Sequence, residues 1–289
     1  MKKSLIYTMI TAVLFSTLEP VSKLIASDVS AYAITFWRFI IGSFVLIAPA
    51  MHKTLSDKVK ISVKDILLSA LLGILFICVS MISLQYAVKI ADNPSLTAII
   101  FSANSIFTII LAAIIIKEKL TKYKIFALIF GIVGVLLCIN YRNGAGNASS
   151  FLLAVFAAVS FSLYTVLSKK YTQKAGVIQT FLVFIFGSVI LLLFLIAGGV
   201  DIIPPLNPKN IFILLYLGIF VTGIGYACYF KAIEENGTIM GSLAFLIKPV
   251  LTPFVTYIIN GIKPTAIIYF SVIMICISSY FAVFKKHNS

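Results

Sequence analysis

Charged residues are scarce in this chain, and the groups that most catalysis and metal binding require are scarcer still. Only 11% of the 289 residues are charged, nine are acidic and two are histidine. No P-loop, GxGxxG or GxSxG motif occurs, and His52 and His287 stand apart from any acidic cluster. The sequence therefore argues against an ATP-driven pump or a hydrolase, and it predicts neither a bound cofactor nor a metal.

Cysteine is equally sparse and unpatterned. The four cysteines each lie alone in an apolar run, without CxxC spacing. Isolated cysteines of this kind behave as small apolar residues, so we expect reduced, structural thiols. They are Cys78, Cys138, Cys228 and Cys276.

Long apolar runs are what the sequence has in excess. Hydrophobic residues make up 61% of the chain and the mean hydropathy is +1.11, whereas soluble domains are about 45–50% apolar. A membrane-spanning helix needs roughly 20 mainly apolar residues, and strict polar–apolar alternation, the signature of barrel strands, is absent. The sequence predicts an all-α integral membrane protein with ten transmembrane helices. The runs are 4–26, 31–50, 65–87, 95–116, 123–140, 150–168, 177–198, 210–230, 238–259 and 264–284.

The basic residues are distributed unevenly between the two ends of these runs. With the N-terminus inside, sixteen fall on the cytoplasmic side and four on the other. This asymmetry orients membrane helices, so we expect a multi-pass protein of the cell membrane with both termini in the cytoplasm. The net charge of +14 then needs no nucleic-acid partner. The sixteen are Lys2, Lys3, Lys53, Lys58, Lys60, Lys64, Lys117, Lys119, Lys122, Lys124, Lys169, Lys170, Lys174, Lys231, Lys285 and Lys286; the four are Lys89, Arg142, Lys209 and Lys263.

The sequence repeats itself at an offset of about half its length. TFWRFIIGS at 35–43 matches TFLVFIFGS at 180–188, and AVLFSTLEPVSK at 12–23 matches AVSFSLYTVLSK at 158–169. Residues 1–26 alone would resemble a signal peptide. Because their counterpart lies in mid-chain, where no signal peptide can be, we expect the first run to be a permanent helix.

The repeat divides the chain into two units, 1–140 and 148–289, each with five predicted spans. An odd number of spans makes the second unit enter the membrane in the opposite sense. The sequence therefore predicts an inverted-topology repeat with a pseudo-two-fold axis in the membrane plane. In secondary transporters such repeats enclose a substrate site near the midplane, and the site is exposed alternately to the two sides.

These features resemble those of a known family. The two five-span halves, the FWRFIIGS stretch and the segment IIIKEKLTKYKIFALIFGIVGVLL at 114–137 are similar to the EamA branch of the drug/metabolite transporter superfamily. The resemblance implies a secondary transporter of small metabolites, often an exporter, that uses neither ATP nor a bound cofactor. One position departs from the family pattern, because Ile262 in the second half replaces the acidic residue that Glu118 provides in the first.

Glu19, Arg38 and Lys248 lie well inside the predicted spans, and Lys23 lies a few residues from the end of its span. A charge at mid-membrane costs roughly 2.5–3.5 kcal/mol and usually faces the protein interior or a water-filled cavity. We expect Lys23 to extend to the outer interface and Glu19 to pair with Arg38 or Lys23. Lys248, the deepest, is then left as a docking point for an anionic group. The alternatives for Lys248 are a neutral amine or a pair with Glu19.

Proline follows two of these charges directly, in Glu19-Pro20 and Lys248-Pro249, and Pro253 lies one turn further on. Proline removes a helical hydrogen bond. We therefore expect helix breaks in spans 4–26 and 238–259, of the kind that frame midplane sites in transporters.

Other polar and aromatic residues within spans complete the predicted site. At an offset of 144, Asn104 aligns with Lys248. The remaining candidates are Trp37, Gln85, Tyr164, Tyr226 and Tyr229. The GIVG stretch at 131–134 is typical of a helix-packing face of small residues.

The leading hypothesis is a carrier of a small carboxylate-bearing solute such as an amino acid, in the lipid bilayer. Lys248 and Arg38 would attract the anionic group, and Glu19 would carry a proton or contact an ammonium group. The first rival is an exporter of cationic or amphipathic compounds with Glu19 as the attractor. The second, an intramembrane enzyme or lipid-handling scaffold, is disfavoured because the sequence shows no paired carboxylates and no nucleophile–base arrangement.

Overall fold

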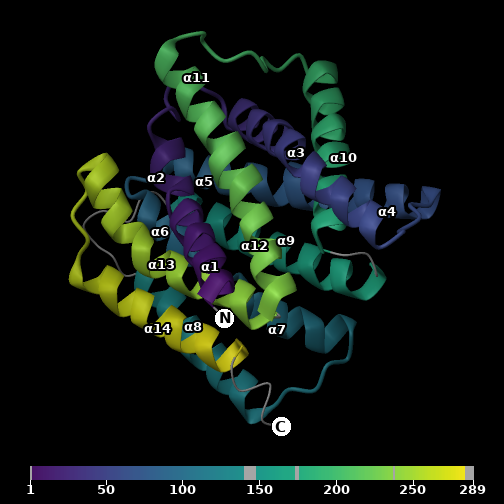
Figure 1. Ribbon diagram of the computed structural model, residues 1–289. Coiled ribbons are helices and arrows are strands. Elements are labelled where there is room, and N and C mark those ends of the chain that lie inside the picture. Colours follow the sequence, from purple (N-terminus) through teal and green to yellow (C-terminus); the bar gives the residue numbers. More distant parts are fainter. Residues whose placement is uncertain (1, 140–147, 173–175, 237, 284–289) are drawn as a thin grey trace.

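The computed structural model describes residues 2–139, 148–172, 176–236 and 238–283, and its regular structure over these ranges is helical (Figure 1). Two helical stretches of π type, η1 and η2, interrupt the α-helices. In chain order the elements are α1 (Lys2–Ser16), α2 (Leu18–Lys23), α3 (Ala31–Ser56), α4 (Val63–Gly73), η1 (Ile74–Met81), α5 (Ile82–Ile90), α6 (Pro94–Ser102), α7 (Asn104–Ile115), α8 (Lys122–Ile139), α9 (Ala148–Tyr171), α10 (Gly176–Ala197), α11 (Pro208–Leu215), η2 (Tyr216–Ile224), α12 (Gly225–Asn236), α13 (Thr238–Asn260) and α14 (Ala266–Val283).

Within the described residues, eight helical stretches are long and apolar enough to cross a membrane. They coincide with eight of the ten predicted runs. The other two runs, 123–140 and 264–284, correspond to α8 and α14, of which α14 contributes a shorter apolar stretch, Ala266–Phe281. The full count of ten spans stays a prediction. The eight are Lys3–Lys23, Ala31–Ser56, Val63–Ile90, Pro94–Ile115, Ala148–Tyr171, Gly176–Ala197, Pro208–Glu235 and Leu243–Asn260.

Proline predicts one helix break correctly and another wrongly. The first span is interrupted at Thr17, between α1 and α2, just before Glu19-Pro20. In contrast, α13 continues from Thr238 to Asn260 through Pro249 and Pro253. The expected break there is wrong because α13 packs against α1, α6, α12 and α14, and such packing lets a helix tolerate the loss of single hydrogen bonds. A second interruption, at Ala103 between α6 and α7, has no proline at all.

The helix contacts of the first half recur in the second half with the halves exchanged. Helix α3 of the first half packs on η2 of the second half, and its counterpart α10 packs on η1 and α4 of the first half. In the same way, α1 packs on α12, and its counterpart α9 packs on α5 and η1. Helix α3 also packs against its own counterpart α10, and α8 packs against its counterpart α14. The two π segments also occupy corresponding places, since each lies in the third span of its half. The repeat seen in the sequence is therefore present in the packing.

Helices α8 and α14 form a closely packed pair at one side of the molecule (Figure 1). A Cβ atom added to Gly134 would lie 3.0 Å from the side chain of Ile275, so the helices approach through the GIVG stretch. The hydroxyl of Ser278 donates a hydrogen bond across this contact to the Ala127 carbonyl (2.6 Å). The predicted packing role of GIVG is confirmed.

Candidate functional site

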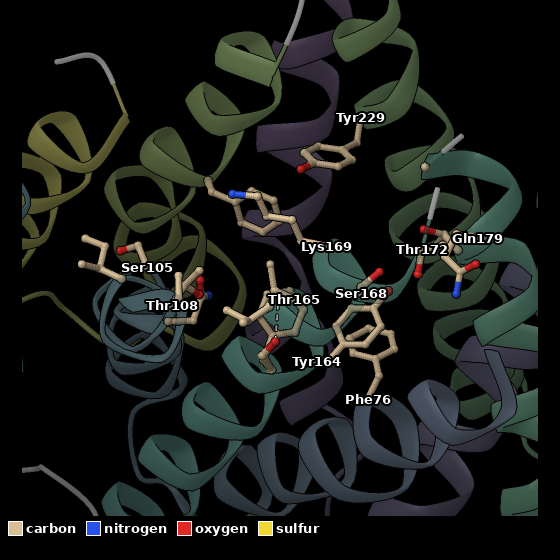
Figure 2. Close-up of a pocket in the computed structure, with 18 of the residues that line it drawn as sticks. Phe76, Ser105, Thr108, Tyr164, Thr165, Ser168, Lys169, Thr172, Gln179 and Tyr229 are labelled. Atoms are coloured by element: carbon tan, nitrogen blue, oxygen red, sulfur yellow. Dashed lines mark hydrogen bonds between the residues drawn. The ribbon is translucent and has the colours of Figure 1, made fainter. Parts of the chain in front are cut away.

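A cavity of about 750 Å³ lies between helices of both halves. Its walls come from α7, α9, α10, α12 and α13, with further residues from η1, α6, α8 and α14 (Figure 2). Pockets for small organic molecules are about 300–1,000 Å³ and mainly apolar. The cavity therefore has the size of a metabolite-binding site, and it lies where the two halves meet.

Aromatic rings close the inner end of the cavity. Phe76 stacks on Tyr164 with ring centroids 4.7 Å apart, and Phe184 lies 5.7 Å from Phe76 and 5.1 Å from Tyr226. Behind them, Phe39 contacts both Phe76 (5.3 Å) and Phe184 (4.8 Å). We call Phe76, Tyr164, Phe184 and Tyr226 the aromatic floor. Such a surface suits an apolar or flat solute group, and its negative ring faces also attract cations.

Hydroxyl groups line the walls above the aromatic floor. Thr165 and Ser168 come from α9, and Ser105 and Thr108 face them from α7 (Figure 2). The Thr165 hydroxyl donates to the Phe161 carbonyl (2.9 Å), whereas Ser105 Oγ has no hydrogen-bond partner in the structure. These walls offer a solute hydrogen bonds without a full charge.

The other end of the cavity reaches the surface between charged residues. Glu118 forms ion pairs with Lys124 (3.2 Å) and Lys169 (3.7 Å), and the Lys169 side chain is 58% exposed. All three residues line the cavity. The cavity is therefore entered through a mouth in which positive charge exceeds negative charge.

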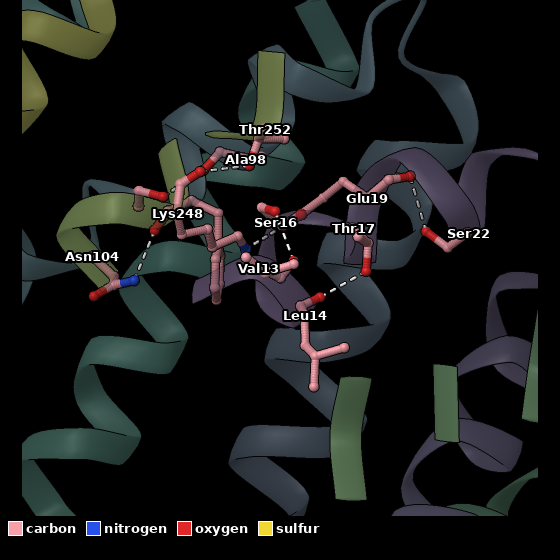
Figure 3. A network of polar contacts seen from close by, with 12 residues as sticks. Val13, Leu14, Ser16, Thr17, Glu19, Ser22, Ala98, Asn104, Lys248 and Thr252 are labelled. Atoms are coloured by element: carbon pink, nitrogen blue, oxygen red, sulfur yellow. Dashed lines mark hydrogen bonds and ion pairs between the residues drawn. The ribbon is translucent and has the colours of Figure 1, made fainter. Parts of the chain in front are cut away.

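Glu19 and Lys248 form a buried ion pair outside this cavity. Lys248 Nζ lies 2.6 Å from Glu19 Oε1, and their side chains are 4% and 0% exposed, respectively (Figure 3). Neither residue lines the cavity. The expectation that Glu19 pairs with Arg38 or Lys23 and leaves Lys248 unpaired is wrong. The interruption at Thr17 sets the rotation of α2, and α2 packs directly against α13, so the carboxylate meets Lys248.

Arg38 is the buried cation without a carboxylate partner. It makes no ion pair within the described part of the chain, its Nε has no hydrogen-bond partner, and it is 4% exposed. Its guanidinium carbon lies 4.4 Å from the centroid of the Phe39 ring. Glu19 and Tyr226 lie close enough to Arg38 to interact with its charge. Arg38 therefore sits behind the aromatic floor, adjacent to the cavity without lining it.

Lys23 binds the C-terminal end of a neighbouring helix. Its Nζ donates to the carbonyl oxygens of Lys89 (2.9 Å) and Ala91 (2.5 Å), at the C-terminus of α5. Cations are favourable there because the last carbonyls of a helix lack partners. The contact ties α2 to α5, and because Lys23 is only half-buried the expectation that it extends to the outer interface stays a prediction.

The other predicted site residues divide into two groups. Asn104, Tyr164, Tyr226 and Tyr229 line the cavity. Trp37 and Gln85 do not: Trp37 Nε1 donates to the Ile202 carbonyl (3.0 Å), which ties α3 to the segment before α11, and Gln85 is buried with no partner for Nε2. Sequence reasoning missed the phenylalanines and hydroxyl residues of the walls. The available signal was the repeat itself, because Phe161 and Ser168 match Phe15 and Ser22.

Fold and site together define a multi-pass membrane protein with an internal cavity that opens at a charged mouth. The model of the EamA-like transporter family matches this chain twice, over residues 2–140 and 148–284. The chain belongs to the EamA-like transporter family, and it is a membrane transporter and not an enzyme.

Individual relatives agree with this placement. A protein of Clostridium kluyveri described as "Uncharacterized transporter" is 34% identical over 288 residues, covering 96% of this chain and 92% of the relative. A "S-adenosylmethionine uptake transporter" of Rickettsia bellii is 26% identical over 160 residues, covering 55% of this chain and 53% of the relative. A protein of known crystal structure shares the fold, with a TM-score of 0.69, 18% identity and coverage of 99% of this chain and 98% of that chain.

Proposed function

We infer that this protein is a secondary carrier of small amino-acid-like solutes that works by alternating access. The observation that carries this proposal is the cavity of about 750 Å³ between the two halves, lined by aromatic rings and hydroxyl groups and by the charged residues Glu118 and Lys169, of which Lys169 is largely exposed. Helix α2, the counterpart of the cavity helix α9, does not line the cavity, and Lys23 holds it to α5. One open and one closed approach to a single site is what alternating access requires.

The orientation we propose places the open mouth and both termini in the cytoplasm. The mouth is lined by Lys124 and Lys169, which belong to the basic side of the sequence, and basic loops stay in the cytoplasm. The exchanged helix contacts of the two halves support an inverted repeat. In a secondary carrier the direction of net flux follows the gradients of the solute and of any coupling ion, so the same cavity serves export or uptake.

The proposed solute class follows from the charges next to the cavity. Arg38 has no carboxylate partner, and the buried charges Glu19, Lys248 and Arg38 sum to one positive charge. An added carboxylate would balance that charge, because an uncompensated buried cation is unfavourable. An amino acid supplies the carboxylate together with a side chain for the aromatic floor. Proton coupling through Glu19 belongs to the same proposal.

A second candidate is a cationic or amphipathic solute, as in the rival hypothesis from the sequence. It is favoured by the aromatic floor, because sulfonium and ammonium groups bind to ring faces, and by the relatives described as S-adenosylmethionine uptake transporters. S-adenosylmethionine combines a sulfonium cation, a flat adenine ring and an amino-acid group, so it belongs to both classes.

Flux into proteoliposomes tests the proposal and separates the candidates. Purified protein is reconstituted, and the uptake of labelled neutral amino acids and of labelled S-adenosylmethionine is compared with uptake into empty liposomes. We expect protein-dependent, saturable flux of at least one amino-acid-like solute. Flux of organic cations without an amino-acid group, insensitive to amino acids, would select the rival. Absence of any protein-dependent flux would contradict both candidates.

A further inference from the structure

Six lysines gather on one rim of the molecule, at the end of α7, the start of α8 and the end of α9. Polar contacts hold these three segments together. Glu118 pairs with Lys124 (3.2 Å) and with Lys169 (3.7 Å). Next to it, Lys170 Nζ donates to the Ile115 carbonyl (3.4 Å). We call the six lysines the basic rim: Lys117, Lys119, Lys122, Lys124, Lys169 and Lys170.

The basic rim carries a large excess of positive charge. Within the described ranges its ion pairs go to Glu118, so six lysines face one carboxylate. Lys117, Lys119 and Lys122 are exposed and form no ion pair with a carboxylate in this part of the chain. Like charges held close together repel one another and destabilise the structure that holds them. A rim of this kind is therefore favourable with an anionic partner.

The repeat shows that the fold does not require lysine at these places. At the offset of 144, Lys122 aligns with Ala266, and Lys124 aligns with Ile268. Ile268 is fully buried in the apolar core around α14. The same position of the same fold thus accepts a small or apolar residue, and packing alone does not account for the lysines.

Lys117 adopts a backbone conformation that disfavours any side chain. Its φ is 59°, and it ends α7, where the amides of Ile116 and Glu118 both donate to the Ala112 carbonyl (3.0 and 3.2 Å). Glycine is the usual residue at such a helix end, and the second half has Gly261 there, with a φ of 71°. Backbone strain of this kind accumulates at functional sites. The exposed charge of Lys117 is therefore present at the expense of local backbone strain.

The basic rim lies where membrane spans end. The apolar stretches Pro94–Ile115 and Ala148–Tyr171 both finish at it. Tyr171 is 56% exposed, and Lys170 Nζ lies 5.2 Å from the centre of its ring. Ile114, in the last turn of α7, is 69% exposed. Exposed tyrosine beside exposed aliphatic residues is typical of the interface between lipid and water, so the lysines lie at the level of lipid headgroups.

We propose that the basic rim is a binding site for the headgroup of an anionic phospholipid. Clusters of roughly four to eight basic residues directly beside a membrane span attract such lipids. The exposed lysines Lys119, Lys122 and Lys170 bind the phosphate, and the acyl chains lie along exposed aliphatic side chains such as Ile114 of α7 and Ile125 of α8. A soluble phosphate offers the same headgroup chemistry but nothing for the apolar surface, so the lipid is the occupant that the rim fits.

The lipid site lies beside the path of the solute and is separate from it. Lys124 and Lys169 line the cavity and stay paired with Glu118, whereas Lys119 and Lys122 do not line it. A bound headgroup therefore adds negative charge next to the mouth without occupying the cavity. Because the site needs only the rim and the bilayer, it does not depend on which solute the cavity takes.

Quenching of a local fluorophore by brominated lipids tests the site. The chain has one tryptophan, so Trp37→Phe provides a background without tryptophan. Tyr171→Trp then places a reporter at the basic rim. The control reporter is Tyr257→Trp, because Tyr257 is 46% exposed in the last turn of α13, on the opposite predicted side of the membrane. Each full-length protein is reconstituted at low ionic strength in phosphatidylcholine that contains brominated phosphatidylglycerol or, in parallel, brominated phosphatidylcholine.

We expect brominated phosphatidylglycerol to half-quench the Tyr171→Trp reporter at a mole fraction at least threefold lower than brominated phosphatidylcholine. The Tyr257→Trp reporter should respond equally to both lipids. Equal quenching of the Tyr171→Trp reporter by the two lipids would overturn the site. None of these measurements involves transport, so this outcome would leave the proposed function untouched.

Lysine variants show whether the preference comes from the rim itself. The triple variant Lys119→Gln, Lys122→Gln and Lys170→Gln should lose the preference, and arginine at the same three positions should keep it. The matched control, Lys58→Gln, Lys60→Gln and Lys64→Gln, removes the same charge from another basic loop of the same predicted side and should keep the preference. Equal losses in the two glutamine triples would attribute the effect to net charge alone and overturn the site.

Two further measurements complete the test. If the Lys119, Lys122 and Lys170 glutamine triple does not give monodisperse protein, the three single variants replace it, and each should weaken the preference. Unchanged preference in all three would count against the site. Glycerol 3-phosphate added at constant ionic strength separates lipid from soluble phosphate. We expect it to leave the quenching unchanged, and loss of the preference would assign the rim to soluble phosphates and overturn the lipid proposal.

Discussion

Gly73 and Gly187 bring two helices of different halves into backbone contact. A Cβ atom added to Gly73 would lie 2.7 Å from the Cα atom of Gly187, closer than any side chain permits. Their counterparts at the offset of 145 are Gly218 and Gly42, and a Cβ atom on Gly42 would lie 3.4 Å from the Gly218 carbonyl oxygen. The same small-residue contact thus occurs twice, once on each side of the α3–α10 pair. Small residues permit such close approach between membrane helices.

This contact predicts a local sensitivity to size. Gly187→Val places two methyl groups against Gly73 and should destabilise the protein by about 1–3 kcal/mol, the usual cost of overpacking. Thermal unfolding in detergent measures the change. The control is Leu193→Ala on the same helix, because Leu193 is 62% exposed and faces lipid or detergent. A Gly187→Val protein as stable as the control would contradict the close contact.

The Glu19–Lys248 pair predicts an unusual mutational pattern. Glu19→Gln or Lys248→Met alone leaves an unpaired buried charge, which costs about 3–5 kcal/mol. The double variant leaves no charge from this pair and should regain most of the lost stability, while transport of charged solutes stays impaired. Thermal unfolding of the two single variants and the double variant tests the coupling. Additive losses in the double variant would show that the two residues do not depend on each other.

Lys23 predicts a shift between conformations and not a loss of folding. Lys23→Met removes the two hydrogen bonds that hold α2 to the carbonyls at the end of α5. A loss of about 1.4 kcal/mol in the stability of this contact corresponds to a tenfold change in population. Ser22 is buried on the same helix, so a cysteine introduced as Ser22→Cys in a protein without its other cysteines should react about tenfold faster with a membrane-impermeant maleimide. Lys263→Met, which changes an exposed lysine of the same predicted side, is the control. Unchanged labelling in Lys23→Met would mean that Lys23 does not hold α2 against α5.

The fold could be read from the sequence further than the site. Over the residues that the structure describes, each predicted run coincides with helix, because about 20 apolar residues have few alternatives in a membrane. The π segment at Ile74–Met81 and the interruption at Ala103 could not be predicted, since neither carries a proline or a glycine pair. The GIVG contact was predicted because small residues mark packing faces.

The site could be predicted only where polarity distinguishes a residue from its surroundings. Tyr164 and Tyr226 were candidates because a hydroxyl group within an apolar span is recognisable in the sequence, and both line the cavity. Phe76 and Phe184 line it equally, but a phenylalanine facing lipid and one facing a cavity are indistinguishable in a sequence. The partner of Glu19 was left open among Arg38, Lys23 and Lys248, because pairing depends on helix rotation, and a single turn decides between Lys23 and Lys248; the alternative of a pair with Lys248 is the one observed.

The aromatic floor predicts that a ring, and not a hydroxyl group, is what the solute requires at Tyr164. Tyr164→Phe keeps the stack on Phe76 and should leave the KM for transport within about twofold. Tyr164→Ala removes a ring contact of about 0.5–1.5 kcal/mol and should raise KM up to about tenfold. Initial rates in proteoliposomes measure both, with Tyr257→Ala as the control, because Tyr257 is 46% exposed and lies outside the cavity. If Tyr164→Phe lost as much affinity as Tyr164→Ala, the solute would be recognised by hydrogen bonding instead, and the aromatic floor would serve only to close the cavity.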